Sequence, residues 1–177
     1  YKKSKYSLSV NSCTAALHLS LISLGLKKGD EVITTPMTFC STINSILLVG
    51  AKPVLVDINP DTLNIDENMI SKKINSKTKA LMIVHFAGLA CNMAPIMKIC
   101  KKHNLRLIED CAHAIESKYF NKEVGNFGDA GCFSFYATKN ITTGEGGMLL
   151  TNKTKIYNRV RTMRLHGLSK DAWKRYL

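Results

Sequence analysis

Short apolar segments rich in β-branched residues alternate with helical patterns along the chain, and this alternation constrains the fold more than any other feature. Glu31–Thr35, Pro53–Ile58 and Ala80–His85 have the composition of strands. Ala80–His85 is continuously apolar, which is typical of a strand buried on both faces of a parallel sheet. Strands that alternate with helices favour an α/β fold. We therefore expect a mostly parallel central sheet flanked by helices.

The remaining elements follow the same alternation. Further strands are expected at Leu105–Asp110, Gly131–Tyr136 and Gly147–Thr151. Helices are expected from about Asn11 to Leu24, Thr38 to Val49, Asp66 to Ile74, Met93 to His103 and Lys153 to His166. Asn11 or Ser12 can cap the first helix, and Gly25 ends it. Residues 121–128 are expected to form a turn-rich excursion.

Length and charge exclude several classes of protein. The 177 residues suit one domain or a piece of a larger chain, and we expect a fragment clipped at both ends. No apolar run is long enough to cross a bilayer, and no secretory signal follows Tyr1, so a cytoplasmic protein is expected. The net charge is +12, but the lysines are scattered without interleaved aromatics. This pattern disfavours nucleic-acid binding.

The six cysteines are expected to be reduced thiols. A disulfide framework belongs to short secreted chains, and this chain has neither property. A zinc site could be assembled from the set Cys91, Cys100, His103, Cys111 and His113. The spacing of this set matches no paired-ligand pattern, so no metal is expected.

Chemically useful side chains stand just after two of the expected strands, at the edge of an α/β sheet where ligands bind. Asp110 ends the strand 105–110, where a buried carboxylate needs a partner such as a protonated pyridine nitrogen. An N-cap for a helix at Ala112–Ile115 explains Asp110 equally well. Lys139 follows the strand 131–136 and is flanked by small, hydroxyl and glycine residues. Partial desolvation there would allow its amine to act as a nucleophile, although a lysine in a loop is usually a solvated charge.

The start of the first helix is a candidate anion site. Unpaired N–H groups and the helix dipole favour an anion there, and Thr14 adds a hydroxyl, although an ordinary capped helix is the commoner case. Phe39 is a candidate ring-stacking face, although a single aromatic more often belongs to a core. The segment Gly144–Gly147 matches neither a dinucleotide-binding fingerprint nor a P-loop.

Together these segments resemble one family. Glu109-Asp110-Cys111-Ala112-His113-Ala114, Phe133–Asn140 and Gly144-Glu145-Gly146-Gly147 are similar to motifs of the DegT/DnrJ/EryC1/StrS family of pyridoxal-phosphate (PLP)-dependent sugar aminotransferases. Ser12–Leu17, Thr35–Phe39 and Arg164-Leu165-His166-Gly167 are similar to further family motifs in the right order. The resemblance implies the large, three-layer α/β/α domain of the aspartate-aminotransferase fold, without the small C-terminal domain.

The resemblance also implies roles for individual residues. Lys139 matches the lysine that holds the cofactor covalently and shuttles a proton, and Asp110 matches the carboxylate that keeps the pyridine nitrogen protonated. Thr14, Ala15 and Ser134 match the residues that cradle the phosphate. Phe39 matches the aromatic that stacks on the ring, and His113 matches a residue close to the ring. Cys13 departs from the family, which usually has glycine there, and a slightly altered backbone near the phosphate is expected.

The function implied is transfer of an amino group, with glutamate as the donor and a nucleotide-linked keto-sugar as the acceptor, in polysaccharide or amino-sugar biosynthesis. A homodimer with a shared active site is implied too. The family's sugar-dehydrating branch has histidine in place of the lysine, so Lys139 disfavours that branch. Another PLP reaction on this fold, such as a lyase or desulfurase, and a non-catalytic PLP-scaffold protein remain alternatives.

Overall fold

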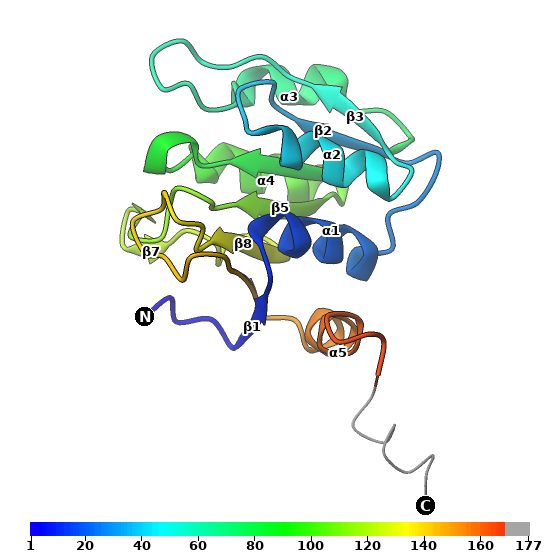
Figure 1. Ribbon diagram of the computed structural model, residues 1–177. Helices are drawn as coiled ribbons and strands as arrows, with labels where there is room; N and C mark the ends of the chain where they lie inside the picture. The colour runs from blue at the N-terminus through cyan, green and yellow to red at the C-terminus, as the bar shows by residue number, and fades with distance from the viewer. Residues whose placement is uncertain (169–177) are drawn as a thin grey trace, which may run out of the picture.

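The computed structural model describes residues 1–168, and seven strands form its central sheet (Figure 1). They are β1 (Tyr6–Val10), β2 (Glu31–Thr34), β3 (Lys52–Leu55), β4 (Thr78–Val84), β5 (Arg106–Asp110), β8 (Ala130–Ser134) and β9 (Gly147–Thr151). Their spatial order is β1-β9-β8-β5-β4-β2-β3. The pairs from β3 to β8 are parallel, whereas β9 pairs antiparallel with both β8 and β1. The predicted mostly parallel sheet is confirmed.

Helices cover both faces of this sheet (Figure 1). They are α1 (Cys13–Leu24), α2 (Cys40–Leu48), α3 (Glu67–Lys73), α4 (Met93–His103) and α5 (Thr154–Met163), with a short 3-10 helix η1 (Phe86–Gly88). Helix α1 packs against α2 and α5 over one face, and α3 contacts α4 over the other. The predicted α/β/α layering is therefore present.

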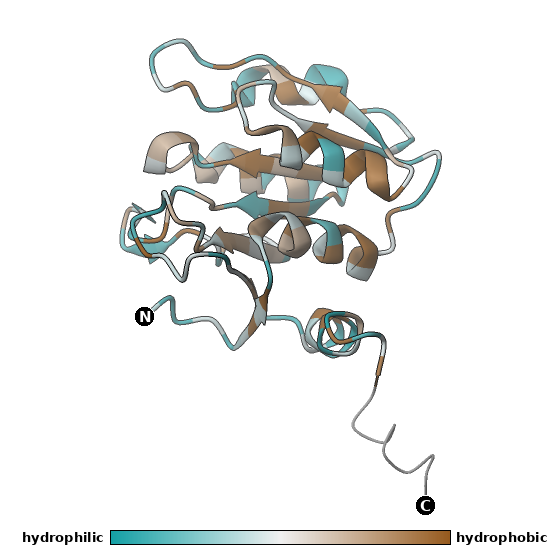
Figure 2. Cartoon of the chain, in the orientation of Figure 1, coloured by the Kyte–Doolittle hydropathy of each residue, from teal (hydrophilic) through white to brown (hydrophobic). Residues whose placement is uncertain are grey.

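The two faces of the sheet bury separate sets of side chains because successive residues of a strand point to opposite sides. Val32 and Met82 belong to the core beneath α1 and α2, whereas their neighbours Ile33 and Leu81 belong to the core beneath α3 and α4. Figure 2 shows the strands of the sheet to be largely hydrophobic. Burial on both faces explains why residues 80–84 of the central strand β4 are all apolar.

The ends of α1 follow from its sequence. Ser12 Oγ accepts a hydrogen bond of 3.1 Å from the N–H of Ala15, which makes Ser12 the N-cap. Gly25 ends the helix with a left-handed φ of 84°, and its N–H returns to the carbonyls of Leu21 and Ile22. Both predicted ends are confirmed. The cap fixes the first turn of α1 at the edge of the sheet where β4, β5 and β8 finish.

Several elements differ from the predictions. Strand β1 was not expected, and a two-stranded hairpin, β6 (Lys118–Tyr119) with β7 (Lys122–Glu123), lies beside the predicted turn-rich segment. Strand β8 ends at Ser134 instead of Tyr136, because the N–H of Phe135 bonds the carbonyl of Gly146 and the chain turns there. The other boundaries differ from the predictions by only a few residues.

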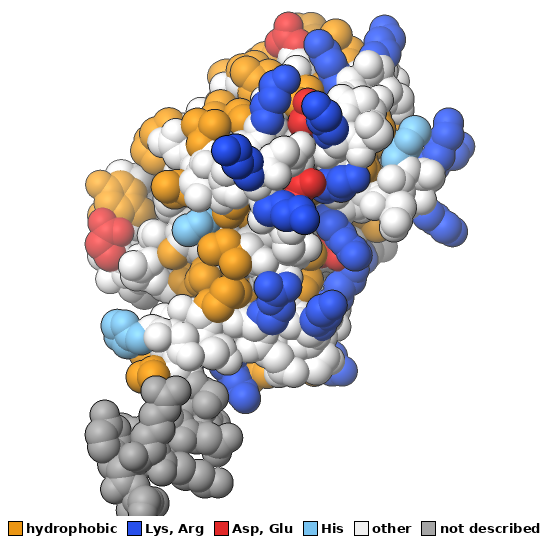
Figure 3. All heavy atoms as spheres, turned by 90° about the vertical axis from the view of Figure 1, so that its right-hand side faces the viewer, with side chains coloured by type: hydrophobic (Ala, Val, Ile, Leu, Met, Phe, Trp, Pro, Cys, Tyr) orange, Lys and Arg blue, Asp and Glu red, His pale blue; other side chains and the backbone are white. Residues whose placement is uncertain are grey.

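The surface at the amino ends of the parallel strands is strongly basic. Figure 3 views the molecule from this side and shows many Lys and Arg side chains. Exposed basic residues stand just before or at the start of the strands: Lys28, Lys52, Lys77 and Arg106. This charge lies on the side opposite the carboxyl ends of the strands. Within residues 1–168, no helix has the length and hydropathy needed to cross a membrane.

Candidate cofactor-binding site

A cavity of about 520 Å³ opens at the carboxyl ends of the parallel strands. Six of the seven residues predicted for the site line it: Thr14, Phe39, Asp110, His113, Ser134 and Lys139. Ala15 does not, because it lies one residue further into α1 and its N–H is already bonded to Ser12 Oγ. Residues up to 125 positions apart in the sequence thus meet around one space, whose volume suits a small cofactor.

Asp110 forms the buried wall of the cavity. Its Oδ2 accepts a hydrogen bond of 2.8 Å from the hydroxyl of Thr42, and its Oδ1 accepts one of 3.1 Å from the N–H of Ala112. The thiol of Cys13 lies 3.8 Å from Oδ1. Burial raises the pKa of this carboxyl, and the bonds from Thr42 and Ala112 oppose the rise. No helix follows at residues 112–115, so the alternative N-cap prediction for Asp110 is wrong.

Lys139 lies in a turn on the opposite side of the same cavity. Its backbone N–H bonds the carbonyl of Tyr136 at 2.9 Å, and its side chain is half-buried. The following loop is held by the hydroxyls of Thr142 and Thr143, which bond the carbonyls of Phe135 and Glu145. Among residues 1–168, no carboxylate lies within 4.0 Å of the Lys139 amine. The amine is therefore available to a ligand in the cavity.

The charges of Lys139 and Asp110 shift the pKa of His113 in opposite directions. Burial and the nearby charge of Lys139 lower the pKa of its imidazole, and Asp110 opposes this shift. Its ring meets Phe86 edge-on, with 6.4 Å between the ring centroids. The imidazole is therefore biased toward its neutral form at neutral pH, in which it can approach an aromatic ring without adding charge.

The first turn of α1 forms another part of the cavity wall. Thr14 lines it, and the positive end of the helix dipole lies there. Gly147 packs tightly behind this turn, since a Cβ at that position would lie 2.4 Å from the carbonyl oxygen of Ser12. Cys13 begins a regularly capped helix, and its buried thiol is within contact of Asp110. Burial and the neighbouring carboxylate raise its pKa, so the thiol stays protonated.

The donor set fits PLP. The amino end of α1 suits the phosphate, as helix N-termini suit anions. Asp110 would pair with the pyridine nitrogen, Lys139 would bind the aldehyde carbon, and Phe39 would cover the ring. The side chain of Phe39 is 75% exposed, so its ring has an apolar face free for such a contact.

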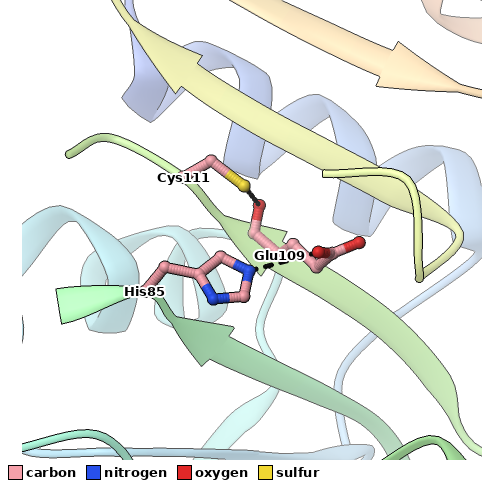
Figure 4. A group of neighbouring side chains, drawn as sticks. All are labelled: His85, Glu109 and Cys111. Carbon is pink, nitrogen blue, oxygen red and sulfur yellow. Dashed lines mark hydrogen bonds and ion pairs between the residues drawn. The ribbon is translucent and has the colours of Figure 1, made fainter. Parts of the chain in front are cut away.

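Two other features singled out in the sequence have structural explanations. Arg164, from the last family-like motif, donates from Nη1 to the carbonyl and hydroxyl of Ser9 and so ties the end of α5 to β1. The alternative zinc set does not gather: in the described part of the chain the only cluster of potential ligands is His85, Glu109 and Cys111 (Figure 4).

The side chains of that cluster already have hydrogen-bond partners within the protein. His85 Nδ1 accepts the N–H of Cys91 at 3.0 Å, so Nε2 carries the proton and donates to Glu109 at 3.1 Å. Figure 4 shows the imidazole turned toward Glu109 and the Cys111 thiol turned toward the backbone oxygen of Glu109. The arrangement explains the cluster without a metal ion.

Thr42 is the site residue that the sequence does not reveal. It is fully buried, does not reach the cavity surface, and contacts Asp110 from α2, 68 residues away in the chain. A threonine inside an amphipathic helix carries no local signal of such a contact. Thr38, Tyr136 and Glu145 also line the cavity and were not predicted.

Comparison with known proteins identifies relatives over nearly the whole chain. The chain is 53% identical over 176 residues to the uncharacterized protein MJ1066 of Methanocaldococcus jannaschii, covering 99% of this chain and 46% of the relative. It is 49% identical to the spore coat polysaccharide biosynthesis protein SpsC of Bacillus subtilis, covering 97% and 44%. It is 45% identical to GDP-perosamine synthase of Escherichia coli O157:H7, covering 93% and 45%. The chain thus spans about half the length of these relatives.

Solved aminotransferase structures have the same fold as this chain. An aminotransferase from Psychrobacter cryohalolentis superposes with a TM-score of 0.94 at 40% identity, over 98% of this chain and 44% of that one. A sugar aminotransferase named Spr1654 from Streptococcus pneumoniae, solved in PMP and PLP forms, superposes with TM-scores of 0.90 and 0.88 at 34% and 33% identity. These two forms cover 98% and 96% of this chain, and 49% and 48% of theirs. The model of the DegT/DnrJ/EryC1/StrS aminotransferase family matches residues 1–177, and the chain belongs to that family.

Proposed function

We propose that this protein is a PLP-dependent aminotransferase that transfers an amino group to a sugar. The observation that carries the proposal is the convergence of the Asp110 carboxylate and the Lys139 amine on one cavity of about 520 Å³. A fixed anion opposite a lysine is the pair that a PLP enzyme requires, and family membership over the whole chain supports the same chemistry.

The residues of the chain divide the work. When bound, PLP supplies a conjugated ring that takes up negative charge from the substrate carbon. Asp110 accepts a hydrogen bond from the protonated ring nitrogen and keeps the proton there. The amine of Lys139 would hold the cofactor and serve as the base that moves the proton of the substrate carbon. Thr14 and Ser134 would bind the phosphate, and Phe39 and His113 would contact the ring.

The acceptor proposed is a nucleotide-linked keto-sugar, with glutamate as the amino donor. The names of two relatives, GDP-perosamine synthase and a spore coat polysaccharide biosynthesis protein, support this class of acceptor. A lysine at position 139 also supports amine transfer over sugar dehydration. We further propose that the enzyme works in the cytoplasm, in the biosynthesis of amino sugars or surface polysaccharides.

A homodimer is also part of the proposal. Large apolar side chains are exposed beside the cavity and along α2: Phe39 (75%), Leu47 (54%), Leu48 (65%) and Tyr136 (46%). Exposed apolar surface of this kind favours contact with another protein chain. A second copy that covers these residues would also enclose the open side of the cavity.

An absorbance titration of the full-length protein tests the function. The wild-type protein with PLP should absorb near the visible edge, and glutamate should abolish that band as the amino group moves to the cofactor. Lys139→Ala should lack the band and transfer no amine, whereas Lys155→Ala, an exposed lysine on α5, should match the wild type. Amine transfer by Lys139→Ala at the parental rate would refute the assignment, and inertness to glutamate would favour a lyase, a desulfurase or a non-catalytic protein.

A further inference from the structure

Two hydroxyl groups link the edge of the cavity to the buried Asp110 carboxylate. The Oγ1 atoms of Thr38 and Thr42 are 2.7 Å apart, and Thr42 Oγ1 is 2.8 Å from Asp110 Oδ2. Thr42 is 0% exposed, whereas Thr38 lines the cavity. Thr38, just before α2, and Thr42, in its first turn, therefore form a chain of two hydroxyls from the cavity edge to the carboxylate.

The direction of these hydrogen bonds follows from the chemistry of their members. A hydroxyl has one hydrogen to donate. Thr42 donates its hydrogen to Asp110, so its oxygen is left to accept from Thr38. The other carboxylate oxygen is occupied by the backbone N–H of Ala112 at 3.1 Å. Both oxygens of Asp110 thus receive a hydrogen bond from the protein before any ligand arrives.

This arrangement matters because Asp110 is 4% exposed, and burial alone favours the neutral acid. A neutral Asp110 would no longer hold a proton on a pyridine ring. Hydrogen bonds to the charged form are the main means by which a protein keeps a buried carboxylate ionised. The N–H of Ala112 is a fixed part of the backbone, so Thr42 is the side chain that chiefly sets this balance.

The geometry points to Thr42 as a positioning residue for the reaction: its hydroxyl, oriented by Thr38, holds the Asp110 carboxylate in its anionic form and turned toward the cofactor pocket. This inference rests on the proposed function, because it assigns a role only to the carboxylate that would face the ring nitrogen. Thr42 acts through Asp110 and touches neither the cofactor nor the substrate.

Other groups also face Asp110, and the test must separate them from Thr42. They come from α1, the end of β4, β8 and the segment after β5, and are Cys13, His85, Cys132, Cys111 and His113. Lys139 lines the same cavity. A substitution that changes only the Thr42 hydroxyl leaves all of these groups in place.

Three substitutions isolate the hydroxyl. Thr42→Val removes it and keeps the shape of the side chain, whereas Thr42→Ser keeps the hydroxyl and removes the methyl group. Thr34→Val is the matched control: Thr34 is also a fully buried threonine, and its hydroxyl has no hydrogen-bond partner among the described residues. Thr34 does not line the cavity, so its substitution tests only the cost of replacing a buried hydroxyl by a methyl group.

The full-length holoenzyme is measured for kcat, KM for glutamate, PLP affinity and the pH dependence of each. Thr42→Val should lower kcat about tenfold, the effect of losing a hydrogen bond to a charged group, with little change in KM. It should also move the acid limb of both the kcat profile and the PLP-affinity profile to higher pH. Thr42→Ser should restore all of these values, and Thr34→Val should match the wild type.

The outcomes separate this inference from the proposed function. A wild-type protein that binds PLP but does not react with glutamate would refute the function. An active wild type with Thr42→Val unchanged in kcat and in the acid limbs would overturn the role of Thr42. So would a loss shared by Thr34→Val, a loss without a shift of the acid limbs, or a failure of Thr42→Ser to restore activity.

Discussion

The imidazole of His85 donates a hydrogen bond of 3.1 Å to the carboxylate of Glu109, and both side chains are 0% exposed. Three backbone N–H groups, those of Gly125, Phe127 and Gly128, each donate to the same carboxylate at 2.7 Å. Each oxygen of Glu109 therefore accepts two hydrogen bonds. The residue next to Asp110 thus anchors the excursion at residues 124–128 to β5.

Glu109→Gln should destabilise the protein by about 3 kcal/mol, the cost of breaking a buried charged group away from its partners. Whichever oxygen becomes the amide NH2 then faces two N–H donors, and His85 cannot relieve this by changing tautomer, because its Nδ1 accepts from Cys91. Urea unfolding of the full-length protein measures the change. Glu116→Gln, at an exposed carboxylate, should remain within about 0.5 kcal/mol of wild type. Equal effects of the two substitutions would contradict the anchoring role.

Lys2→Met should also destabilise the protein, by about 2 kcal/mol. The Lys2 amine is buried and bonds the carbonyl of Ile115 at 3.0 Å and the carboxylate of Glu123 at 3.2 Å. Burial raises the pKa of Glu123, but the hydrogen bonds from Lys2 and Lys118 outweigh it, and the pKa is lowered overall.

A lowered carboxyl pKa fixes the sign of the pH effect. The stability from this ion pair is present above the unfolded pKa of Glu123 and is lost as the pH falls through the lower, folded value. The difference between wild type and Lys2→Met should therefore shrink on going from neutral pH to acid. Urea unfolding at several pH values measures it, with Lys155→Met as the surface control. A difference that grows toward acid pH would be inconsistent with the pair.

The fold could be predicted where the sequence carries a clear pattern of apolar or helix-capping residues. Residues 80–84 of β4 are a continuous apolar run, and α1 carries its own capping residues, so the sequence alone predicts both elements. Strand β1 was missed although Tyr6, Leu8 and Val10 alternate with serines. It is an edge strand beside β9, and five residues with one buried side chain give a weak signal. The two-residue strands of the hairpin give none.

Only those site residues that lie at or after the end of a strand could be predicted from their place in the sheet. Asp110 ends β5 and Lys139 lies in the turn after β8, so the parallel pairing of these two strands brings both residues to one edge. Thr42 could not be found this way, because its role depends on how α2 packs over the sheet. Ala15, matched to the phosphate cradle by resemblance, does not line the cavity, because the Ser12 cap takes its N–H; its contact with a phosphate stays a prediction.

Gly147→Ala should weaken PLP binding as well as stability. The new Cβ would lie 2.3–2.4 Å from the carbonyl group of Ser12, so the first turn of α1 must shift from its position at the cavity. Overpacking of this kind costs about 2–3 kcal/mol. Gly29→Ala is the control: nothing lies within 4 Å of its Cβ position, so only its left-handed φ of 95° is strained, at about 1 kcal/mol. Thermal unfolding and PLP titration of both variants should show weaker binding for Gly147→Ala alone.

The imidazole of His113 offers a direct probe of the cavity that needs no cofactor. Its pKa is lowered by burial and by the positive charge of Lys139, and is raised by the negative charge of Asp110. In the cofactor-free, full-length protein, NMR titration should therefore place this pKa below its ordinary value of 6.5. Lys139→Ala removes the repulsion and should raise it, whereas Asp110→Asn removes the attraction and should lower it further.

The opposite signs of the two expected pKa changes distinguish a shared cavity from a general loss of structure. A general loss of structure would complete the hydration of the imidazole and move its pKa upward in both variants, because partial desolvation is the largest cause of the depression. Only two charges of opposite sign near one ring give a rise in one variant and a fall in the other. Lys155→Ala should leave the titration unchanged. If the pKa of His113 responds to neither Lys139 nor Asp110, the two groups do not share the cavity, and the cofactor site argued from their convergence is wrong.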